Sequence, residues 1–407
     1  MVRTLTAVAL AVVAALVLAA AAGAADPQDP FYRTPTPPKR LPGKVHGDVI
    51  RQKTLTGAAV VPGAATTRLV IYRSQDVHGY AVPVSGVVSI PKGREPKGGW
   101  PVITYAHGTT GIADQCAPSH DTTTSPVHPY NAYIYPLLTR WLKAGYAVVR
   151  TDYQGLGTLY DHQYLVGVTE GRSVLDMVRA ARQALPGRLS RRIAIAGHSQ
   201  GGHAALFAAA LAPKYTPELS LQGTVAFAPA SHLEDQLPLA ANLTQPNPGL
   251  TALIATIAEG LAAAYGDAGM DPKAFELVDA LSVPNGILLG TESMSMCLPE
   301  LGAEATKLGL TPATTLKPPA DLAKLRRLLG ANDPSHLKIT TPLLIEQGLA
   351  DQTVVPLFTT QLATELRTNG ATRLTYNQVA GVDHAGITAG AGATAATKFI
   401  EKTLKRR

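Results

Sequence analysis

The 407-residue sequence is poor in charged and aromatic side chains and has only two cysteines. Charged residues make up 16% of the chain and aromatic residues 5%, whereas 46% of it is hydrophobic. No stretch interleaves basic with aromatic residues, so we expect no nucleic-acid partner despite a net charge of +7. The hydrophobic content is ample for a large core, in one large domain with an insertion or in two domains.

Sequence signatures of bound cofactors are also missing. The chain has neither a glycine-rich phosphate loop nor a dinucleotide fingerprint. Several histidines show no metal-ligand spacing such as H-E-x-x-H, namely His120, His128, His162, His203, His232 and His336. We therefore expect no metal site and no cofactor.

The one long hydrophobic run lies at the N-terminus. Arg3 precedes an almost purely apolar stretch over residues 5–22, and the small residues 23–25 then lead to Asp26. This pattern predicts a secretory signal peptide over residues 1–25, cleaved near Ala25, with an uncleaved membrane anchor as the alternative. We find no second stretch long and apolar enough to cross a bilayer. We expect a secreted, extracellular protein with no stable membrane insertion after signal removal.

Export affects the interpretation of the two cysteines. Cys116 and Cys297 allow a single intrachain pairing, which an oxidising compartment favours. The loop closed by such a disulfide would be very long, so the chain-entropy model gives a stabilisation of about 4–5 kcal/mol. Two unpaired buried thiols are the alternative.

The order of the expected elements indicates the fold class. Residues 26–47 are rich in proline and are expected to form an extended lead-in. Over residues 48–230, β-type runs alternate with helical patterns; the strands are expected at residues 69–73, 82–90, 100–106, 146–151, 192–198 and 221–228, and the helices at residues 131–143, 171–185 and 203–212. This alternation predicts an α/β fold with a mostly parallel sheet and helices on both faces.

The alternation stops over residues 231–335. We find no convincing strand there, only apolar helical stretches at residues 250–265 and 275–281, separated by proline and glycine. Strand patterns return at residues 342–348 and 373–379, within a second core segment over residues 336–407. We therefore predict that residues 231–335 form a helical cap, inserted after the sixth strand and covering the carboxyl edge of the sheet.

The motif G-H-S-Q-G, residues 197–201, follows a short apolar run and precedes a helical stretch. This context is what a nucleophile elbow requires, because the serine must stand on a tight strand-to-helix turn. Gly197 and Gly201 remove side chains that would collide across such a turn. We therefore predict that Ser199 is a catalytic nucleophile; a plain glycine-rich turn is the alternative.

A serine nucleophile needs a base and a partner that orients the base. On this architecture the acid follows the strand after the cap, and the histidine follows the last strand. Asp351 and His384 occupy these two places, which predicts the triad Ser199, Asp351 and His384. The alternatives are a helix N-cap role for Asp351 and a surface-loop role for His384. Asp383 is the nearest competing acid, but adjacent residues do not easily form the required hydrogen bond.

An oxyanion hole needs two preset N–H groups. The N–H of Gln200, directly after the serine, is expected to supply one. The loop after residues 100–106 contains Gly108, which permits a turn, followed by Thr109 and Thr110, either of which can present the second N–H. We expect His107 to brace this loop. A glycine-containing turn without a role in chemistry is the alternative.

These motifs together resemble the secretory lipase family. The resemblance includes H-G-T-T-G at residues 107–111, C-A-P-S at residues 116–119, D-Y-Q-G at residues 152–155, G-H-S-Q-G-G at residues 197–202, and Asp351 with G-V-D-H at residues 381–384. It implies an α/β-hydrolase core, a helical cap over the site, carboxylic ester hydrolysis, and pairing of Cys116 with a cysteine of the cap. Fungal members carry an acidic residue in the oxyanion loop, where this chain has Thr109 and Thr110.

The expected activity is that of a secreted serine carboxylic ester hydrolase, a lipase cleaving acylglycerol or similar lipid esters, at a lipid–water interface or in solution. An apolar cap favours a lipid-like acyl group. A narrower esterase for aryl, tannin-like or polyester substrates would share every residue named. A serine peptidase and a non-enzymatic binding module on the same fold are further alternatives, although such binding modules tend to lose a triad residue.

Overall fold

The computed structural model describes residues 29–34, 41–266 and 274–405. The expected signal peptide lies outside the described residues, as does part of the proline-rich lead-in. Within the lead-in, Tyr32 is buried, and its hydroxyl pairs with Ser119 Oγ at 2.9 Å. The start of the described chain is thus attached to the body of the protein.

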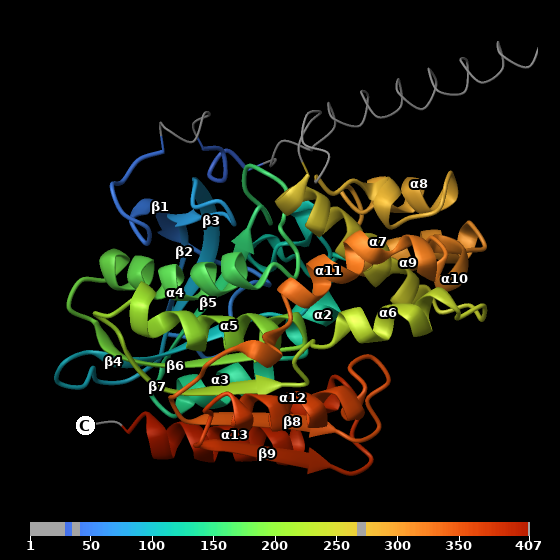
Figure 1. Cartoon of the computed structure of the whole chain (residues 1–407). Helices are drawn as coiled ribbons and strands as arrows, with labels where there is room; N and C mark the ends of the chain where they lie inside the picture. Colours follow the sequence, from blue (N-terminus) through green and yellow to red (C-terminus); the bar gives the residue numbers. More distant parts are fainter. Residues whose placement is uncertain (1–28, 35–40, 267–273, 406–407) are drawn as a thin grey trace, which may run out of the picture.

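A nine-stranded sheet forms the centre of the described part of the chain, with the strand order β1-β2-β3-β5-β4-β6-β7-β8-β9 (Figure 1). The strands are β1 Val49–Thr54, β2 Thr66–Gln75, β3 Ala81–Ile90, β4 Trp100–Ala106, β5 Ala147–Gln154, β6 Leu189–His198, β7 Ser220–Phe227, β8 Leu343–Gly348 and β9 Leu374–Val379. Strands β4 to β9 are parallel to one another, whereas β1, β2 and β3 pair antiparallel at one edge. The predicted mostly parallel sheet is confirmed.

One strand was not expected from the sequence. Residues 49–54 form β1, so the helical insertion follows the seventh strand of the described sheet rather than the sixth. The alternation of buried and exposed positions is weak in β1, because it pairs only with β2 at the sheet edge and stays half-exposed. A short edge strand with Arg51 and Lys53 lacks the apolar run that marks the central strands.

Helices cover both faces of the sheet, as predicted. Along β6, Ile193 and Ile195 pack with α4 and α5, whereas Ala194 and Ala196 face α3 and α13. This alternation follows from the two-residue period of a strand, and burial on both faces explains why the central strands are continuously apolar. The helices are α3 Tyr135–Lys143, α4 Gly167–Ala184, α5 Gln200–Tyr215, α12 Pro356–Thr368 and α13 Gly390–Thr403.

Residues between β7 and β8 form helices that gather on one side of the molecule (Figure 1). These are α6 Leu233–Ala241, α7 Pro248–Tyr265, α8 Asn285–Glu292, α9 Leu298–Lys307, α10 Pro312–Thr315 and α11 Ala323–Ala331. They form two apolar clusters, one of which also includes Val166 and Val168 at the start of α4. The helix expected at residues 275–281 is only one 3₁₀ turn, Leu277–Asp279, because Leu281 pairs as a β-bridge with Leu316.

Helix α7 is long and apolar enough to cross a membrane by length and composition, with a mean hydropathy of 1.3. The expectation that no stretch beyond the N-terminus meets this criterion was therefore wrong. Half of the helix is buried inside the protein. A side chain at Gly260 would come within 2.5 Å of Tyr164 Cβ, so α7 lies directly on the chain that connects β5 and α4. These contacts are those of a buried helix in the insertion.

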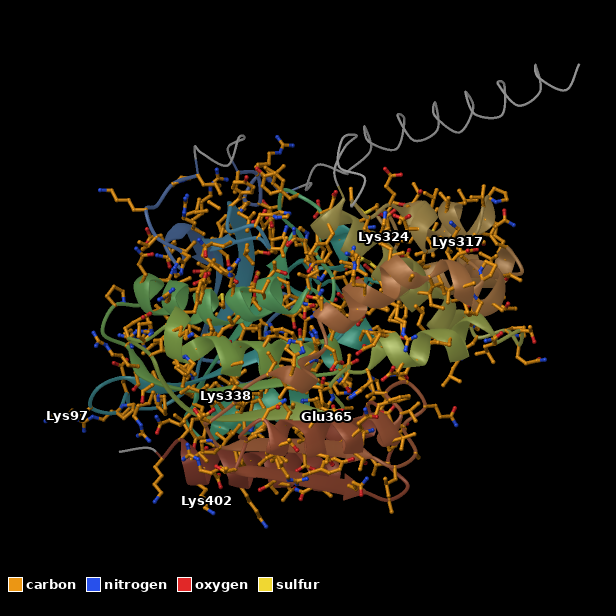
Figure 2. All side chains as sticks on the ribbon, in the orientation of Figure 1. Lys97, Lys317, Lys324, Lys338, Glu365 and Lys402 are labelled. Carbon is orange, nitrogen blue, oxygen red and sulfur yellow. A yellow bond between two sulfur atoms is a disulfide. The ribbon has the colours of Figure 1, made fainter. Side chains whose placement is uncertain are left out.

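Basic side chains are spread over the molecule (Figure 2). The labelled lysines come from separate parts of the chain, namely the β3–β4 loop, the helical insertion, the segment before β8, and α13; they are Lys97, Lys317, Lys324, Lys338 and Lys402. Lys324 is paired with Asp279 at 2.7 Å. The lysines labelled in Figure 2 therefore do not gather on a single element.

Candidate active site

Ser199 stands on a sharp turn between β6 and α5. Its backbone angles are φ 59° and ψ −121°, which a residue with a side chain rarely adopts. A Cβ atom at Gly197 would lie 1.9 Å from the carbonyl oxygen of Gly201, and one at Gly201 would lie 2.0 Å from that of Ala106. Both glycines are therefore required by close backbone approach, as expected for a nucleophile elbow.

Asp351 and His384 lie beyond the carboxyl ends of β8 and β9, and they contact each other. His384 Nδ1 is 2.7 Å from Asp351 Oδ2, and the carboxylate side chain is fully buried. Burial favours a raised pKa for Asp351, but the hydrogen bond and charge of His384, with the N–H groups of Val354 and Thr353, lower it below its usual value. The arrangement suits an acid that stays ionised and fixes the ring of a neighbouring base.

The N-cap alternative for Asp351 does not fit its position. Helix α12 begins at Pro356 with Val355 as its N-cap residue. Asp351 Oδ1 instead accepts hydrogen bonds from the N–H groups of Thr353 and Val354, at 2.8 and 2.9 Å. These contacts close a tight turn that directs the second carboxylate oxygen at His384.

The residue before the serine lies beside His384. The ring of His384 lies 4.4 Å from the ring of His198, the residue before Ser199, measured between centroids. Among the described residues, Ser199 Oγ makes no hydrogen bond. Catalytic hydrogen bonds are often long before substrate binds, so this geometry does not argue against proton transfer between Ser199 and His384.

The expected oxyanion residues surround the elbow. Gln200 opens α5, and the first N–H groups of a helix have no intrahelical partner. Thr109 and Thr110 follow β4, and a Cβ atom at Gly108 would lie 3.6 Å from Ser199 Cβ. The loop and the serine are thus neighbours. The Thr109 hydroxyl pairs with Tyr164 OH at 2.6 Å, and Thr110 is buried.

His107 braces this loop, as expected from the sequence. Its ring contacts the carbonyl of Gly108 at 2.7 Å and that of Asp152 at 3.4 Å. Burial lowers the pKa of His107 to about 4, so the ring is neutral near pH 7. Tyr153, held at φ 71°, donates its hydroxyl to the carbonyl of His107 at 2.8 Å. Asp152 and Tyr153 of the D-Y-Q-G motif therefore hold the first residue of the oxyanion loop in place.

Sequence reasoning missed a buried polar network behind the elbow. Glu170 on α4 accepts hydrogen bonds from Gln200 Nε2 at 2.9 Å and from His203 Nδ1 at 2.8 Å. His203 Nε2 contacts the carbonyl of Asn332 at 2.8 Å. Burial disfavours the charged ring, but Glu170 raises the pKa of His203 above its usual value. The sequence did contain a signal for this network, namely a glutamate and a histidine at positions on the apolar faces of two helices.

The two cysteines form a disulfide, Cys116–Cys297, with Cα atoms 5.4 Å apart. Gly111 pairs with Cys297 as an isolated β-bridge, and the N–H of Leu298 donates to the carbonyl of Thr110 at 2.9 Å. The start of α9 in the insertion is therefore attached by backbone bonds to the loop at Thr110 and Gly111, and by a disulfide to Cys116, which follows that loop.

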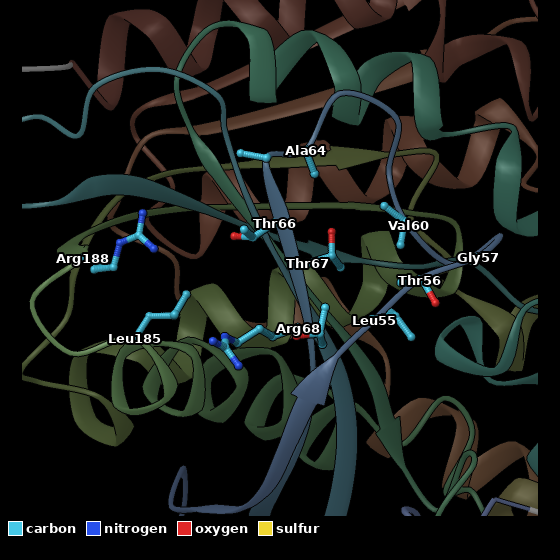
Figure 3. Close-up of a pocket in the computed structure, with 12 residues that line it drawn as sticks. Leu55, Thr56, Gly57, Val60, Ala64, Thr66, Thr67, Arg68, Leu185 and Arg188 are labelled. Atoms are coloured by element: carbon cyan, nitrogen blue, oxygen red, sulfur yellow. The ribbon is translucent and has the colours of Figure 1, made fainter.

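A pocket of about 480 Å³ has none of these residues in its lining (Figure 3). It is lined by Thr66 at the start of β2, and by Leu185 and Arg188. Arg188 precedes β6 whereas Ser199 follows it. The pocket and Ser199 therefore lie at opposite ends of this strand. In the part of the chain that the structure describes, no group of three or more His, Cys, Asp or Glu could hold a metal ion.

The mostly parallel sheet, the helices on both faces and the serine elbow define an α/β-hydrolase fold. The crystal structure of Candida antarctica lipase A in its closed state is similar, with a TM-score of 0.71, 21% sequence identity, and coverage of 88% of this chain and 81% of that chain. Residues 123–268 match the family described as Secretory lipase, which confirms the resemblance seen in the motifs.

Two curated relatives show the range of this similarity. Lipase A of Moesziomyces aphidis is 31% identical over 202 residues, which cover 48% of this chain and 41% of the relative. A protein of Mycobacterium tuberculosis named a "probable inactive lipase" is 26% identical over 211 residues, which cover 50% of this chain and 46% of the relative. The matches therefore span less than half the length of these curated relatives.

Proposed function

We propose that the protein is a serine carboxylic ester hydrolase that acts on lipid esters. The observation that carries this proposal is the hydrogen bond between His384 Nδ1 and the buried Asp351, beside an elbow that presents Ser199. Each of the three residues follows a different strand of the parallel part of the sheet, namely β6, β8 and β9.

In the proposed reaction, Ser199 Oγ attacks the ester carbonyl carbon while His384 Nε2 takes the hydroxyl proton. Asp351 holds the ring so that Nδ1 keeps its proton and Nε2 is free to accept one. The tetrahedral oxyanion receives hydrogen bonds from the N–H of Gln200 and from an N–H of Thr109 or Thr110. His384 then protonates the leaving alcohol, which leaves an acyl-enzyme on Ser199. In the second half of the reaction His384 takes a proton from water as the water attacks the acyl carbon, and it returns that proton to Ser199 Oγ as the acid is released.

Sequence similarity alone does not decide activity, because one relative is named a "probable inactive lipase". The support here comes from the side chains themselves. The carboxylate, imidazole and hydroxyl groups required for acyl transfer are all present, and the acid–base pair is formed at hydrogen-bonding distance. This argument favours a hydrolase over a binding module that retains only the fold.

We propose lipid esters as the substrate class because the helices between β7 and β8 are apolar and are attached to the oxyanion loop. These helices would act as a cap with an apolar lining above Ser199. The similarity to secretory lipases and the N-terminal pattern of residues 1–25 support export to the extracellular space. A disulfide fits that compartment.

A panel of p-nitrophenyl esters from acetate to palmitate, together with a triacylglycerol emulsion, tests the proposal. We expect hydrolysis of several esters and of the emulsion by the wild type and none by Ser199→Ala. Activity confined to short or aryl esters would favour a narrower esterase. Preference for an aminoacyl p-nitroanilide over all esters would favour a peptidase and overturn the proposal.

A further inference from the structure

His198 lies between the serine elbow and the histidine loop, and none of the roles described so far involves its side chain. The residue is 3% exposed. Its Nε2 is 2.8 Å from the backbone carbonyl oxygen of His384, and its Nδ1 is 2.5 Å from the hydroxyl of Tyr133. Tyr133 is the residue that ends helix α2, His128–Ala132. One ring therefore joins three separate parts of the chain.

The partners determine the tautomer of His198. A carbonyl oxygen has no proton to donate, so Nε2 must carry the proton that reaches His384. Burial and the nearby His384 lower the pKa of His198 to about 3, so the ring is neutral and Nδ1 is an acceptor. Burial raises the pKa of the Tyr133 phenol, which therefore keeps its proton and donates it to Nδ1. Each hydrogen-bonding group of the ring thus has a matching partner.

Few other bonds fix the backbone around His384. Val382, two residues earlier, accepts a hydrogen bond from the N–H of Ala350 at 2.9 Å. The next bonds lie within the loop itself, such as that from the N–H of Gly386 to Asp383 Oδ1 at 2.8 Å. The bond from His198 is therefore the direct link between the backbone of His384 and the strand that carries Ser199.

The oxyanion loop lies against this ring. A Cβ atom at Gly108 would lie 3.6 Å from His198 Nδ1, an ordinary van der Waals distance, and 3.3 Å from the His198 carbonyl oxygen, a tighter one. The loop thus packs on the ring and on the backbone of the elbow. The nucleophile strand, the oxyanion loop and the histidine loop converge on one buried side chain.

We propose that His198, held as the Nε2–H tautomer by Tyr133, is a positioning residue that fixes the backbone of His384 relative to Ser199. This inference rests on the proposed function. The Asp351 carboxylate orients the ring of His384 through Nδ1, and His198 fixes the backbone of His384 through its carbonyl oxygen. Because the ring of His198 is neutral, it does so without placing a positive charge beside the imidazolium that forms on His384 during proton transfer.

The tautomer is tested by ¹⁵N NMR of protein labelled at histidine, with the His198 resonances assigned by their loss in His198→Gln. We expect a protonated Nε2 and an unprotonated Nδ1 from pH 5 to pH 9. A ring protonated at Nδ1, or one that titrates within this range, would overturn the proposal. The measurement needs no substrate, so its result stands even if the wild type hydrolyses no ester.

Kinetics and a second NMR signal test the positioning role. Tyr133→Phe should lower kcat about tenfold, and His198→Leu about a hundredfold, with KM within twofold, because small displacements of a base are costly. His198→Gln, which retains an N–H donor, should recover part of the loss. The downfield Nδ1–H proton resonance of His384 should broaden in His198→Leu.

Tyr135→Phe is the matched control. It removes another largely buried tyrosine hydroxyl two residues away, which donates to the carbonyl of Ala58 at 2.9 Å and has no link to the triad. We expect unchanged kcat and an unchanged His384 resonance in this variant. If Tyr133→Phe and His198→Leu match Tyr135→Phe in both readouts, the positioning role is refuted while the esterase activity stands. If the wild type is inactive, the proposed function fails and the His384 resonance alone decides the positioning role.

Discussion

Gln347 Nε2 donates a hydrogen bond to Asp351 Oδ2 at 3.2 Å, the same oxygen that accepts the bond from His384. Gln347 belongs to β8, and its own Oε1 accepts from the hydroxyl of Thr359 on α12 at 2.8 Å. The candidate acid is therefore held from its strand and from the following helix. Each group that forms a hydrogen bond with the Asp351 carboxylate is a donor, so this position suits an acceptor with two oxygens.

Asp351→Asn should reduce turnover on the order of 10⁴-fold. An asparagine retains one oxygen for the N–H groups of Thr353 and Val354, so its amide would face Gln347 and His384. Two donors would then oppose each other, and the ring of His384 would favour a proton on Nε2, where it cannot accept one from serine. Steady-state hydrolysis of p-nitrophenyl butyrate measures the effect.

Asp383→Asn is the control for the acid. Asp383 is exposed, and its Oδ1 accepts a bond from the N–H of Gly386, which an asparagine oxygen can still accept. We expect activity within about threefold of the wild type, since a surface substitution usually changes little. A larger loss in Asp383→Asn than in Asp351→Asn would show that the acid has been assigned to the wrong carboxylate.

Ser199→Ala should abolish both ester hydrolysis and covalent labelling by a fluorophosphonate, read as the mass increase of the intact protein. Triad variants normally lose several orders of magnitude in turnover. The melting temperature should stay close to that of the wild type, because the substitution removes a single half-buried hydroxyl without a hydrogen-bond partner among the described residues. Labelling of Ser199→Ala at the wild-type rate would place the nucleophile elsewhere.

Glu346 gives a pH-dependent prediction for stability. Burial raises the pKa of Glu346 to about 7 from an ordinary value of 4.5, although Asn377 donates to Oε1 at 2.8 Å. Because the folded-state pKa is higher than the unfolded one, its contribution is fully present below about pH 4.5 and is lost as the pH rises through about 7. The ionised carboxylate thus weakens the folded state under alkaline conditions.

Glu346→Gln should therefore change the free energy of unfolding more favourably at pH 8.5 than at pH 4, by about 3 kcal/mol. Urea unfolding at the two pH values measures this difference. Glu401→Gln, an exposed position on α13, is the control and should show no such dependence. An equal effect of Glu346→Gln at both pH values would mean that the carboxyl titrates normally in the folded protein.

The sequence was most informative where chemistry and strand ends coincide. Ser199, Asp351 and His384 could be proposed as a triad because the carboxyl ends of parallel strands meet at one edge, so position in the strand order implies proximity. The β1 strand was missed because a half-exposed edge strand has little apolar signal. The pairing of Leu281 with Leu316, which prevents the helix expected at residues 275–281, depends on a contact between distant residues.

The supporting polar groups were not predictable from spacing. Glu170 and His203 belong to different helices, and their contact exists only because α4 packs on α5. The role inferred for His198 depends on Tyr133, which is 65 residues away in the chain. Local sequence patterns indicate periodicity and turns, whereas these hydrogen bonds depend on how whole helices and strands pack against one another.

The last prediction concerns the disulfide between Cys116 and Cys297. The two residues are 181 positions apart, so the chain-entropy model gives a stabilisation of about 5 kcal/mol. Reductant should therefore lower the melting temperature of the wild type by several degrees and leave Cys116→Ser/Cys297→Ser, the matched control, unaffected. Activity on small soluble esters should survive, because the bond from Leu298 to Thr110 and the Gly111–Cys297 bridge still hold the oxyanion loop. A thiol titration of unfolded, unreduced protein should find no free thiol. Two titratable thiols, or a melting temperature indifferent to reductant, would show that the insertion is attached to the core by noncovalent contacts alone.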